Sequence, residues 1–576
     1  MTTALDRRTA LRRSELRRLS IEVLVATTVG LVAAVALTWP LLSQIGHVAH
    51  DPFDPRFQAW TIDWVQHALR DPFDLFDANI FAPEQRTLAY SDSLIGIAVP
   101  LLPFRWIGVS PIGQLNIALL LGMATSAGSA YLFGRVVSRS RLVGAFAGAA
   151  FAFGPFGTLS SGALHTTVKA GIPLAALGAW WLAERAEARG PMSAPAAFLV
   201  AAASWQLSVS FYPGAYALAA AIAVLLVRAP SLGRRGAKAA VGAFVVIAGV
   251  AVVLAIPYLR VRGEFPSFER SLDTLGPLGA DFFATDPRLS IWGGLLGKGT
   301  GWPVYGVPTF PGLVLCCLAP IGLIGGWRRG PDIRRVVTTA GALVGVGVVL
   351  GLGTASSGWR AWSPYRLLYE FVPGFNALRA TGRGWAVGIL GLGVLAGLGA
   401  VAIADVLARR RPALRRGVGV ALACIAVLGV LVEGYAPWKH LPTVDVSAAD
   451  RALADMPAPG GVLYLPALEP RGPARALSGF RQAENTYATT AHLRRTPNGY
   501  SGFSPPSWPV TSRIVERLPD DRAIDRLRSI DVRFVVVRSW AAGGTWGPLL
   551  DPARALPLRL VGRYDGDVLY KIPKRP

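Results

Sequence analysis

About eleven separate runs of apolar residues, most of them long enough to cross a lipid bilayer, constrain this chain more than any other feature. They lie at 21–45, 112–134, 142–158, 171–184, 193–210, 212–228, 238–257, 310–327, 336–354, 384–407 and 416–434. Backbone groups in lipid must be hydrogen-bonded within the segment, so each run is expected to be helical. With 52% hydrophobic and only 16% charged residues, the chain is too apolar for a string of soluble domains. We therefore expect a polytopic α-helical membrane protein.

The positions of the basic residues predict its orientation. A net charge of +23 would suggest a nucleic-acid partner in a soluble protein, but here the arginines gather in alternate short loops beside the apolar runs. These loops include 135–141, 185–189, 228–238, 328–335 and 409–416. Basic loops stay in the cytoplasm, which places the amino terminus inside and the carboxy-terminal tail outside, with no nucleic acid as partner.

A shorter apolar segment, 94–107, contains Pro100 and Pro103 and ends in Arg105 and Trp106. Counting it as a span would move all five basic loops to the outer side. We expect it instead to lie flat on the outer membrane surface.

The predicted topology divides the chain into three parts. They are a basic cytoplasmic tail at 1–20, a transmembrane domain at 21–434 with outer loops at 46–111, 258–309 and 355–383, and an extracytoplasmic α/β domain at 435–576. In the last part, strand patterns occur at 461–466, 532–537 and 558–572, and helical patterns at 448–454, 510–518 and 521–529. The three cysteines lie inside apolar runs, so we expect no disulfide framework or thiolate metal site outside the membrane.

The first outer loop concentrates acidic and aromatic residues. Asp51 and Asp54 come a few residues after the first span, and Trp60, Trp64, Glu84 and Asp92 follow in the same loop. Most carboxylates in such a loop are helix caps or turn residues. Asp51 and Asp54 differ because a catalytic base needs a fixed position beside a membrane-embedded substrate.

Several motifs resemble the bacterial GT-C membrane glycosyltransferases, in particular the YfhO-like and mannosyltransferase-like membrane proteins. They are Asp54-Pro-x4-Trp60-x3-Trp64, Asn79-Ile-Phe-Ala-Pro-Glu84, Thr87-Leu-Ala-Tyr-Ser-Asp92, Tyr369-Glu-Phe-Val-Pro-Gly-Phe-Asn-Ala-Leu-Arg379-x3-Arg383 and Asn498-Gly-Tyr-Ser-Gly-Phe-Ser-Pro-Pro. The resemblance implies a GT-C-like membrane domain, a catalytic acid in the first outer loop and a soluble carboxy-terminal domain. It also implies transfer of a sugar from a polyprenyl-phosphate carrier with inversion.

On this resemblance the general base is Asp54, with Asp51 as second choice. The resemblance also requires cations that hold the departing phosphate. The candidates are Arg379 and Arg383, which are four residues apart at the start of the tenth span. We expect them to share one helical face at a helix N-terminus. Pairing with loop acids such as Glu370 explains outer arginines equally well.

Other candidates come from the remaining outer loops. His165 and Lys169 form a second basic pair four residues apart, and either a capping role or a donor-phosphate contact explains them. Candidate contacts to substrate or acceptor are Trp60, Trp64, Glu84, Asp92, Tyr212 and Tyr500. For the two tyrosines an ordinary turn is an alternative explanation, because Pro213 and Gly214 follow Tyr212 and the turn-rich loop 498–508 contains Tyr500. No histidine spacing here is diagnostic of a metal, so we expect no metal and no cofactor.

Three functions stay open from sequence. The first is an inverting glycosyltransferase of the bacterial plasma membrane, with a polyprenyl-phosphate sugar as donor and an envelope glycan, lipid or protein as acceptor on the outer face. The second is a transporter or flippase for lipid-linked glycans, although the spans carry few charges except near their ends. The third is a non-catalytic envelope protein whose tail binds glycan.

Overall fold

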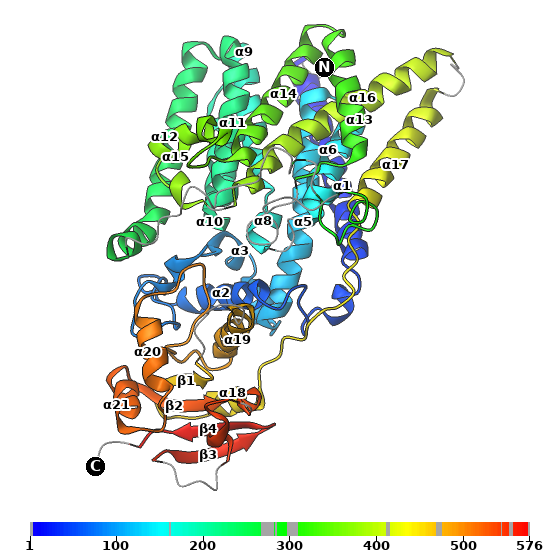
Figure 1. Ribbon diagram of the computed structural model, residues 1–576. Coiled ribbons are helices and arrows are strands. Elements are labelled where there is room, and N and C mark those ends of the chain that lie inside the picture. Colours follow the sequence, from blue (N-terminus) through cyan, green and yellow to red (C-terminus); the bar gives the residue numbers. More distant parts are fainter. Residues whose placement is uncertain are drawn as a thin grey trace. The chain divides into compact units, whose positions relative to one another are not determined.

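The computed structural model describes residues 4–159, 163–265, 282, 285–296, 309–378, 380–410, 415–467, 475–542, 544–551 and 557–573. It divides into two compact units (Figure 1). The first contains 1–43, 117–254 and 269–439, and the second contains 44–116, 255–268 and 440–576.

The first unit is helical. Its elements are α1 (Ala4–Leu37), α5 (Pro111–Ser138), α6 (Arg141–Phe153), α7 (Pro155–Leu159), α8 (Leu164–Thr167), α9 (Gly171–Glu187), α10 (Ser193–Val209), α11 (Phe211–Val227), α12 (Ala229–Glu264), α13 (Leu313–Trp327), α14 (Pro331–Leu352), α15 (Tyr365–Phe371), α16 (Trp385–Arg410) and α17 (Arg415–Glu433), with the 3₁₀ turns η7 (Trp359–Trp362), η8 (Phe375–Ala377) and η9 (Thr381–Gly384). The amino-terminal residues of α5 and the carboxy-terminal residues of α12 belong to the second unit.

Five helices in the described part of the chain are long and apolar enough to cross a membrane. They are Ser14–Leu37, Pro111–Ser138, Ala229–Glu264, Pro331–Leu352 and Thr381–Leu407. Shorter apolar helices accompany them, and each run predicted from the sequence coincides with a helix. The protein is a mostly helical, multi-pass membrane protein.

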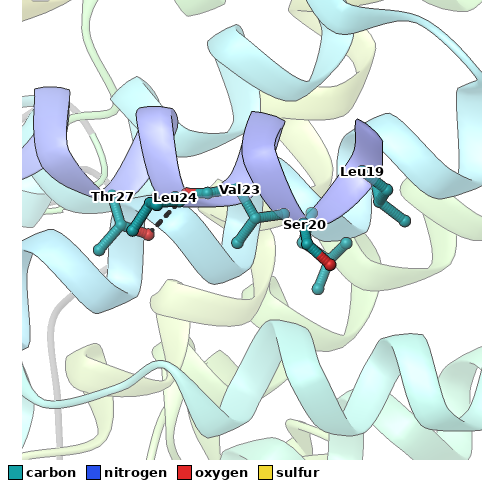
Figure 2. Close-up of a pocket in the computed structure, with 6 residues that line it drawn as sticks. Leu19, Ser20, Val23, Leu24 and Thr27 are labelled. Carbon is teal, nitrogen blue, oxygen red and sulfur yellow. Dashed lines mark hydrogen bonds between the residues drawn. The ribbon is translucent and has the colours of Figure 1, made fainter. Parts of the chain in front are cut away.

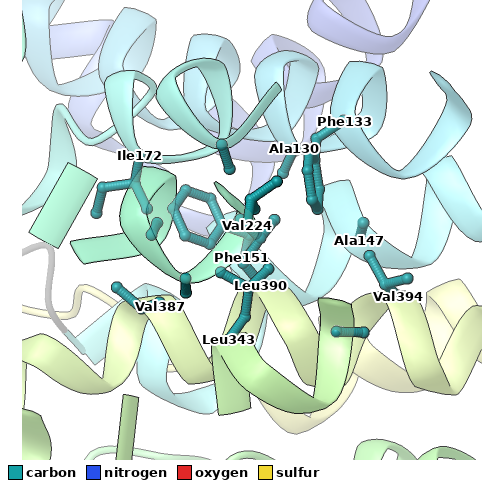
Figure 3. Close-up of a cluster of buried hydrophobic side chains, with 14 of the residues drawn as sticks. Ala130, Phe133, Ala147, Phe151, Ile172, Val224, Leu343, Val387, Leu390 and Val394 are labelled. Carbon is teal, nitrogen blue, oxygen red and sulfur yellow. The ribbon is translucent and has the colours of Figure 1, made fainter. Parts of the chain in front are cut away.

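Close packing by small residues builds the core of this unit around α16. A Cβ atom added to Gly322 of α13 would collide with the carbonyl oxygen of Leu395, and one added to Gly347 of α14 would collide with the backbone nitrogen of Gly388. Such contacts let helix backbones approach closely where lipid gives no hydrophobic drive. Phe133, Phe151 and Leu390 fill the spaces between the helices (Figure 3).

The second unit combines most of the segment that the sequence predicts as the first outer loop with the carboxy-terminal domain. Its elements are η1 (Leu41–Gln44, of which the first three residues belong to the first unit), α2 (Asp54–Ala68), η2 (Thr87–Tyr90), α3 (Ile95–Ala98), α4 (Leu102–Trp106), α18 (Ala448–Ala454), β1 (Gly461–Leu465), α19 (Arg475–Ala488), η12 (Thr489–Ala491), α20 (Ser507–Val515), α21 (Asp521–Ser529), β2 (Val532–Val537), η13 (Ser539–Ala541), η14 (Gly547–Leu550), β3 (Arg559–Tyr564) and β4 (Asp567–Lys571). The segment 94–107 thus folds as two short helices, neither of which is long enough to span a bilayer.

A four-stranded mixed sheet forms the centre of the carboxy-terminal part, in the order β1-β2-β4-β3. β1 pairs parallel with β2, β4 pairs antiparallel with β2, and β3 and β4 form a hairpin. The hairpin turns at Asp565 and Gly566, which have φ of 50° and 90°, as a tight Asp-Gly turn requires. The alternating pattern at 558–572 is therefore two strands.

Candidate functional site

Asp54 begins α2 and lies within a network that joins the first outer loop to the tail. The hydroxyl of Tyr500 donates a hydrogen bond to Asp54 Oδ1 at 2.8 Å. Pro55 occupies the first turn of α2, where its missing N–H costs nothing. Because Asp54 is half-buried and Tyr500 holds one of its oxygens, its carboxylate has a defined orientation and a second oxygen able to accept a proton.

Aromatic rings pack around this pair. The ring of Phe57 contacts that of Tyr500 edge-on, with centroids 5.8 Å apart. Gly479 of α19 lies beside them, and a Cβ atom added there would be 3.6 Å from the Tyr500 ring and 3.9 Å from that of Phe53. The packing of α2 on α19 therefore fixes the position of Asp54 from two sides.

Asp51 has a different environment. Its Oδ1 accepts a hydrogen bond from the backbone N–H of Phe53 at 2.8 Å, which is the local turn interaction typical of aspartate. Asp51 thus takes part in a local turn, whereas Asp54 bonds to a residue of the carboxy-terminal domain.

The other predicted residues of the first outer loop stabilise its fold. Trp60 is buried, and its indole N–H donates to Asn79 Oδ1 at 3.0 Å. The indole of Trp64 donates to the Leu75 carbonyl at 2.9 Å. Glu84, half-buried, accepts a hydrogen bond from Arg495 at its backbone oxygen.

Asp92 lies in the same unit, between two residues that bind Tyr258. The Tyr258 hydroxyl donates to the Ser91 carbonyl at 3.1 Å, and the backbone N–H of Ser93 donates to that hydroxyl at 3.1 Å. These two bonds tie the segment around Asp92 to the carboxy-terminal end of α12.

A second acidic residue of α2, which the sequence patterns do not single out, is buried. Asp63 pairs with Arg105 of α4. Burial raises the pKa of Asp63, and Arg105 opposes that effect. Asp63 comes nine residues after Asp54, inside an apolar stretch of the sequence. A carboxylate at such a position is the sequence signal that could have predicted a buried ion pair.

In the first unit, the structure brings His165, Arg383 and Tyr212 together. Arg383 Nη1 lies 3.0 Å from His165 Nε2, and the guanidinium stands 5.5 Å from the centroid of the Tyr212 ring. Because arginine has only donors, His165 Nε2 is the acceptor in this bond. Three residues from α8, α11 and η9 thus form one cluster.

The predicted helical pair of His165 and Lys169 is wrong, and the predicted pair of Arg379 and Arg383 lies partly outside the described residues. Leu378 (φ −77°, ψ 113°) and Ala380 (φ −110°, ψ 69°) have non-helical backbones. Arg379 itself lies outside the described residues. Likewise α8 ends at Thr167, and Val168 (ψ 79°) turns the chain. The reason is that a four-residue spacing defines a face only in a continuous helix.

Lys169 packs against aromatic rings of α6 and α7. Its ammonium packs over the rings of Phe151 and Phe156, at 5.0 and 5.5 Å from their centroids. Burial lowers the pKa of Lys169 to about 7. This lysine is a buried cation in an aromatic environment.

Similarity to solved structures bears on the fold. The mycobacterial arabinofuranosyltransferase AftD, solved by cryo-EM, matches with a TM-score of 0.57 at 15% identity. The match covers 96% of this chain and 40% of that one. ArnT from Cupriavidus metallidurans, in a crystal structure with undecaprenyl phosphate, matches with a TM-score of 0.51 at 16% identity over 95% of this chain and 97% of that one.

Both proteins are GT-C membrane glycosyltransferases. The chain has a GT-C-like fold. No family model matches the sequence, and no curated protein sequence matches it. The chain spans less than half of the length of AftD. The fold confirms the resemblance that the sequence motifs indicated.

The GT-C-like membrane unit also has an open pocket between α1 and α5. Figure 2 shows its lining by Leu19, Ser20, Val23, Leu24 and Thr27, and Leu132 completes it. The Thr27 hydroxyl donates to the Val23 carbonyl at 2.9 Å. None of these six described lining residues is titratable, so they offer no acid or base.

Among the described residues, no three His, Cys, Asp or Glu side chains lie close enough together to hold a metal ion. His47 contacts Asp445 at 3.2 Å. The histidines of the first outer loop therefore do not form a ligand set within those residues.

Proposed function

We propose that this protein is an inverting GT-C glycosyltransferase of the bacterial plasma membrane. It takes a sugar from a polyprenyl-phosphate donor and transfers it to a cell-envelope acceptor on the outer face. The observation that carries the proposal is the carboxylate of Asp54, oriented by Tyr500 at 2.8 Å in a chain with a GT-C-like fold.

In the proposed reaction, the acceptor hydroxyl loses its proton to Asp54 while its oxygen attacks the anomeric carbon of the donor sugar. The bond between that carbon and the phosphate oxygen breaks, and polyprenyl phosphate leaves with the electron pair. A base in hydrogen-bond reach typically contributes about 10²–10⁴-fold to such a step. Attack from the face opposite the leaving group inverts the anomeric configuration.

We assign the donor phosphate to the cluster of Arg383, His165 and Tyr212. A guanidinium binds phosphate oxygens through forked, charge-assisted hydrogen bonds. The matching structure of ArnT contains bound undecaprenyl phosphate, which supports a lipid phosphate as the ligand class. Arg379 stays a candidate on its sequence position alone.

The proposal includes a topology of about eleven spans, with the amino terminus in the cytoplasm and residues 435–576 outside. The helices α1, α5, α6, α9, α10, α11, α12, α13, α14, α16 and α17 supply these spans. Glycosylation or protease accessibility of the tail in intact cells tests the orientation, and a cytoplasmic tail would contradict it.

The decisive experiment is a transfer assay. The purified full chain in nanodiscs is incubated with labelled polyprenyl-phosphate sugars and an envelope extract, and the anomeric configuration of the product is determined. We expect transfer with inversion by the wild type and a transfer rate about 10³-fold lower for Asp54→Asn. Lipid translocation in vesicles without transfer would favour a flippase instead, and glycan binding without either activity would favour a binding protein.

A further inference from the structure

Two tyrosine side chains of the membrane unit are buried with hydroxyl groups that find no hydrogen-bond partner among the residues that the structure describes. Tyr216 of α11 is 3% exposed and Tyr365 of α15 is 1% exposed. Within that part of the chain, both hydroxyl oxygens are inaccessible and unpaired. An unsatisfied buried polar group costs about 1–3 kcal/mol, so such groups indicate a ligand or ordered water.

Both tyrosines belong to the surroundings of Arg383. Tyr216 lies one helical turn after Tyr212, whose ring faces the guanidinium of Arg383. The Tyr216 ring packs on the adjacent backbone, where a Cβ atom added to Gly384 would lie 3.3 Å from its Cε1. Tyr216 interacts electrostatically with Arg383 and with Tyr365.

Tyr365 reaches the same place from another element. It begins α15, and its ring packs edge-on against that of Phe375, with centroids 5.9 Å apart. Tyr365 also interacts electrostatically with Tyr212. Two phenols from α11 and α15, both unpaired within the described residues, thus accompany one guanidinium.

The chemistry of these groups identifies the class of ligand. Arg383 has only donors, and His165, which accepts at Nε2, carries its hydrogen on Nδ1. The two phenols add O–H donors. A sugar presents hydroxyls that need acceptors as well as donors, whereas a phosphate presents acceptor oxygens alone. A set rich in donors matches the phosphate.

We propose that the hydroxyls of Tyr216 and Tyr365 donate hydrogen bonds to the phosphoryl oxygens of the lipid donor, alongside Arg383. This inference rests on the proposed function. The phenols supply neutral donors, so they bind the phosphate without adding charge to the membrane interior, where charge is expensive. They also leave the departing lipid phosphate free to dissociate once the sugar has been transferred.

The test uses Tyr216→Phe, Tyr365→Phe and the double variant, which remove the hydroxyls and keep the rings. Tyr435→Phe is the matched control, because Tyr435 is an exposed tyrosine of the same unit. Binding to the purified full chain in nanodiscs is measured with four probes: farnesyl phosphate, a sugar-bearing farnesyl phosphate, farnesol and inorganic phosphate.

We expect the single variants to weaken farnesyl phosphate binding about five- to tenfold and the double variant about 50-fold. Weaker binding of inorganic phosphate by the same factor would identify the phosphoryl group itself as the ligand. Farnesol binding should stay unchanged, because it carries no phosphate.

Equal affinity of the double variant and Tyr435→Phe for farnesyl phosphate would overturn the inference while leaving the proposed function intact. A loss of affinity that appears only with a sugar-bearing lipid would also overturn it, since the phenols would then bind the sugar. A wild-type protein that binds no farnesyl phosphate at all would overturn both proposals.

Discussion

The hydroxyl of Tyr500 donates to the carboxylate of Asp54 across 446 residues of sequence. The bond joins the first outer loop to the aromatic loop of the carboxy-terminal domain, and both partners lie in one compact unit. The tail thus contributes directly to the environment of the proposed base.

Replacement of Asp54 by Asn removes the proton acceptor and keeps the side-chain shape and the Tyr500 contact. We expect transfer activity to fall about 10³-fold, with an unchanged thermal unfolding temperature. Asp51→Asn is the control, because Asp51 caps a local turn, and it should retain most of the activity. Equal losses in both variants would remove Asp54 from its assigned role.

Replacement of Tyr500 by Phe removes the hydrogen bond that orients Asp54 and keeps the ring packing against Phe57. The turnover number should fall about tenfold, while KM for the acceptor changes little, because the hydroxyl serves the base. Steady-state kinetics separate the two constants. A rise in KM with unchanged turnover would make Tyr500 an acceptor-binding residue instead.

Replacement of Arg383 by Gln should weaken binding of the lipid phosphate about 100-fold, and Arg383→Lys about tenfold, because lysine retains charge but lacks the fork. Isothermal titration with farnesyl phosphate measures both. Arg366→Gln is the control, since Arg366 already pairs with Glu370. If the Arg366 variant lost as much affinity, the effect would be one of net charge.

Replacement of Arg105 by Leu leaves Asp63 buried without its partner. We expect a loss of about 2 kcal/mol of stability at neutral pH, less than for a fully buried pair because Arg105 is partly exposed. Without Arg105 the pKa of the Asp63 carboxyl rises further, so the folded variant holds this proton more tightly than the unfolded chain does.

The loss of stability relative to the wild type should therefore become smaller as the pH is lowered from 8 to 5. Thermal unfolding of both proteins at the two pH values measures this loss. A deficit independent of pH would rule out the buried carboxylate as its cause.

His492 makes the carboxy-terminal domain sensitive to acid. Its Nδ1 accepts from the Arg494 backbone N–H at 3.0 Å, and its Nε2 pairs with the Tyr464 hydroxyl at 2.8 Å. A proton on Nδ1 would point its N–H at the backbone N–H of Arg494, so the hydrogen bond between them would be lost. Burial lowers the pKa of His492 from 6.5 to about 4.

Because the unfolded chain binds this proton first, stability should fall as the pH drops from 6.5 to 4, by about 3 kcal/mol in total. Unfolding followed by tryptophan fluorescence measures the loss. His492→Gln should flatten the dependence over that range, and an unchanged slope would exclude His492 as its source.

Much of the fold can be predicted from local sequence. Apolar runs predict membrane helices because a helix pairs all of its own backbone groups in lipid, and the strand pattern at 532–537 matches β2. The helix α19 is not among the predicted elements. It contains Gly479 and Ser478, and it buries Gln482 and Asn485, so its core face carries a polar pattern instead of an apolar one.

The sequence predicts residues of the candidate site but not their arrangement. Asp54, Tyr500, His165 and Arg383 each follow from their sequence context. The bonds from Tyr500 to Asp54 and from Arg383 to His165 join segments hundreds of residues apart, and no local pattern encodes such pairing. The helical pair expected for His165 and Lys169 fails because the chain turns at Val168.

By itself, the sequence determined that this chain enters a membrane, because hydropathy and the cost of unpaired backbone groups act locally along the chain. It also predicted candidate residues for the site. The tertiary structure decided which of those residues meet, that Tyr500 orients Asp54, and that the hydroxyls of Tyr216 and Tyr365 are left unpaired within the described part of the chain. These outcomes depend on long-range packing, which is set by the shapes of whole helices and not by any single segment.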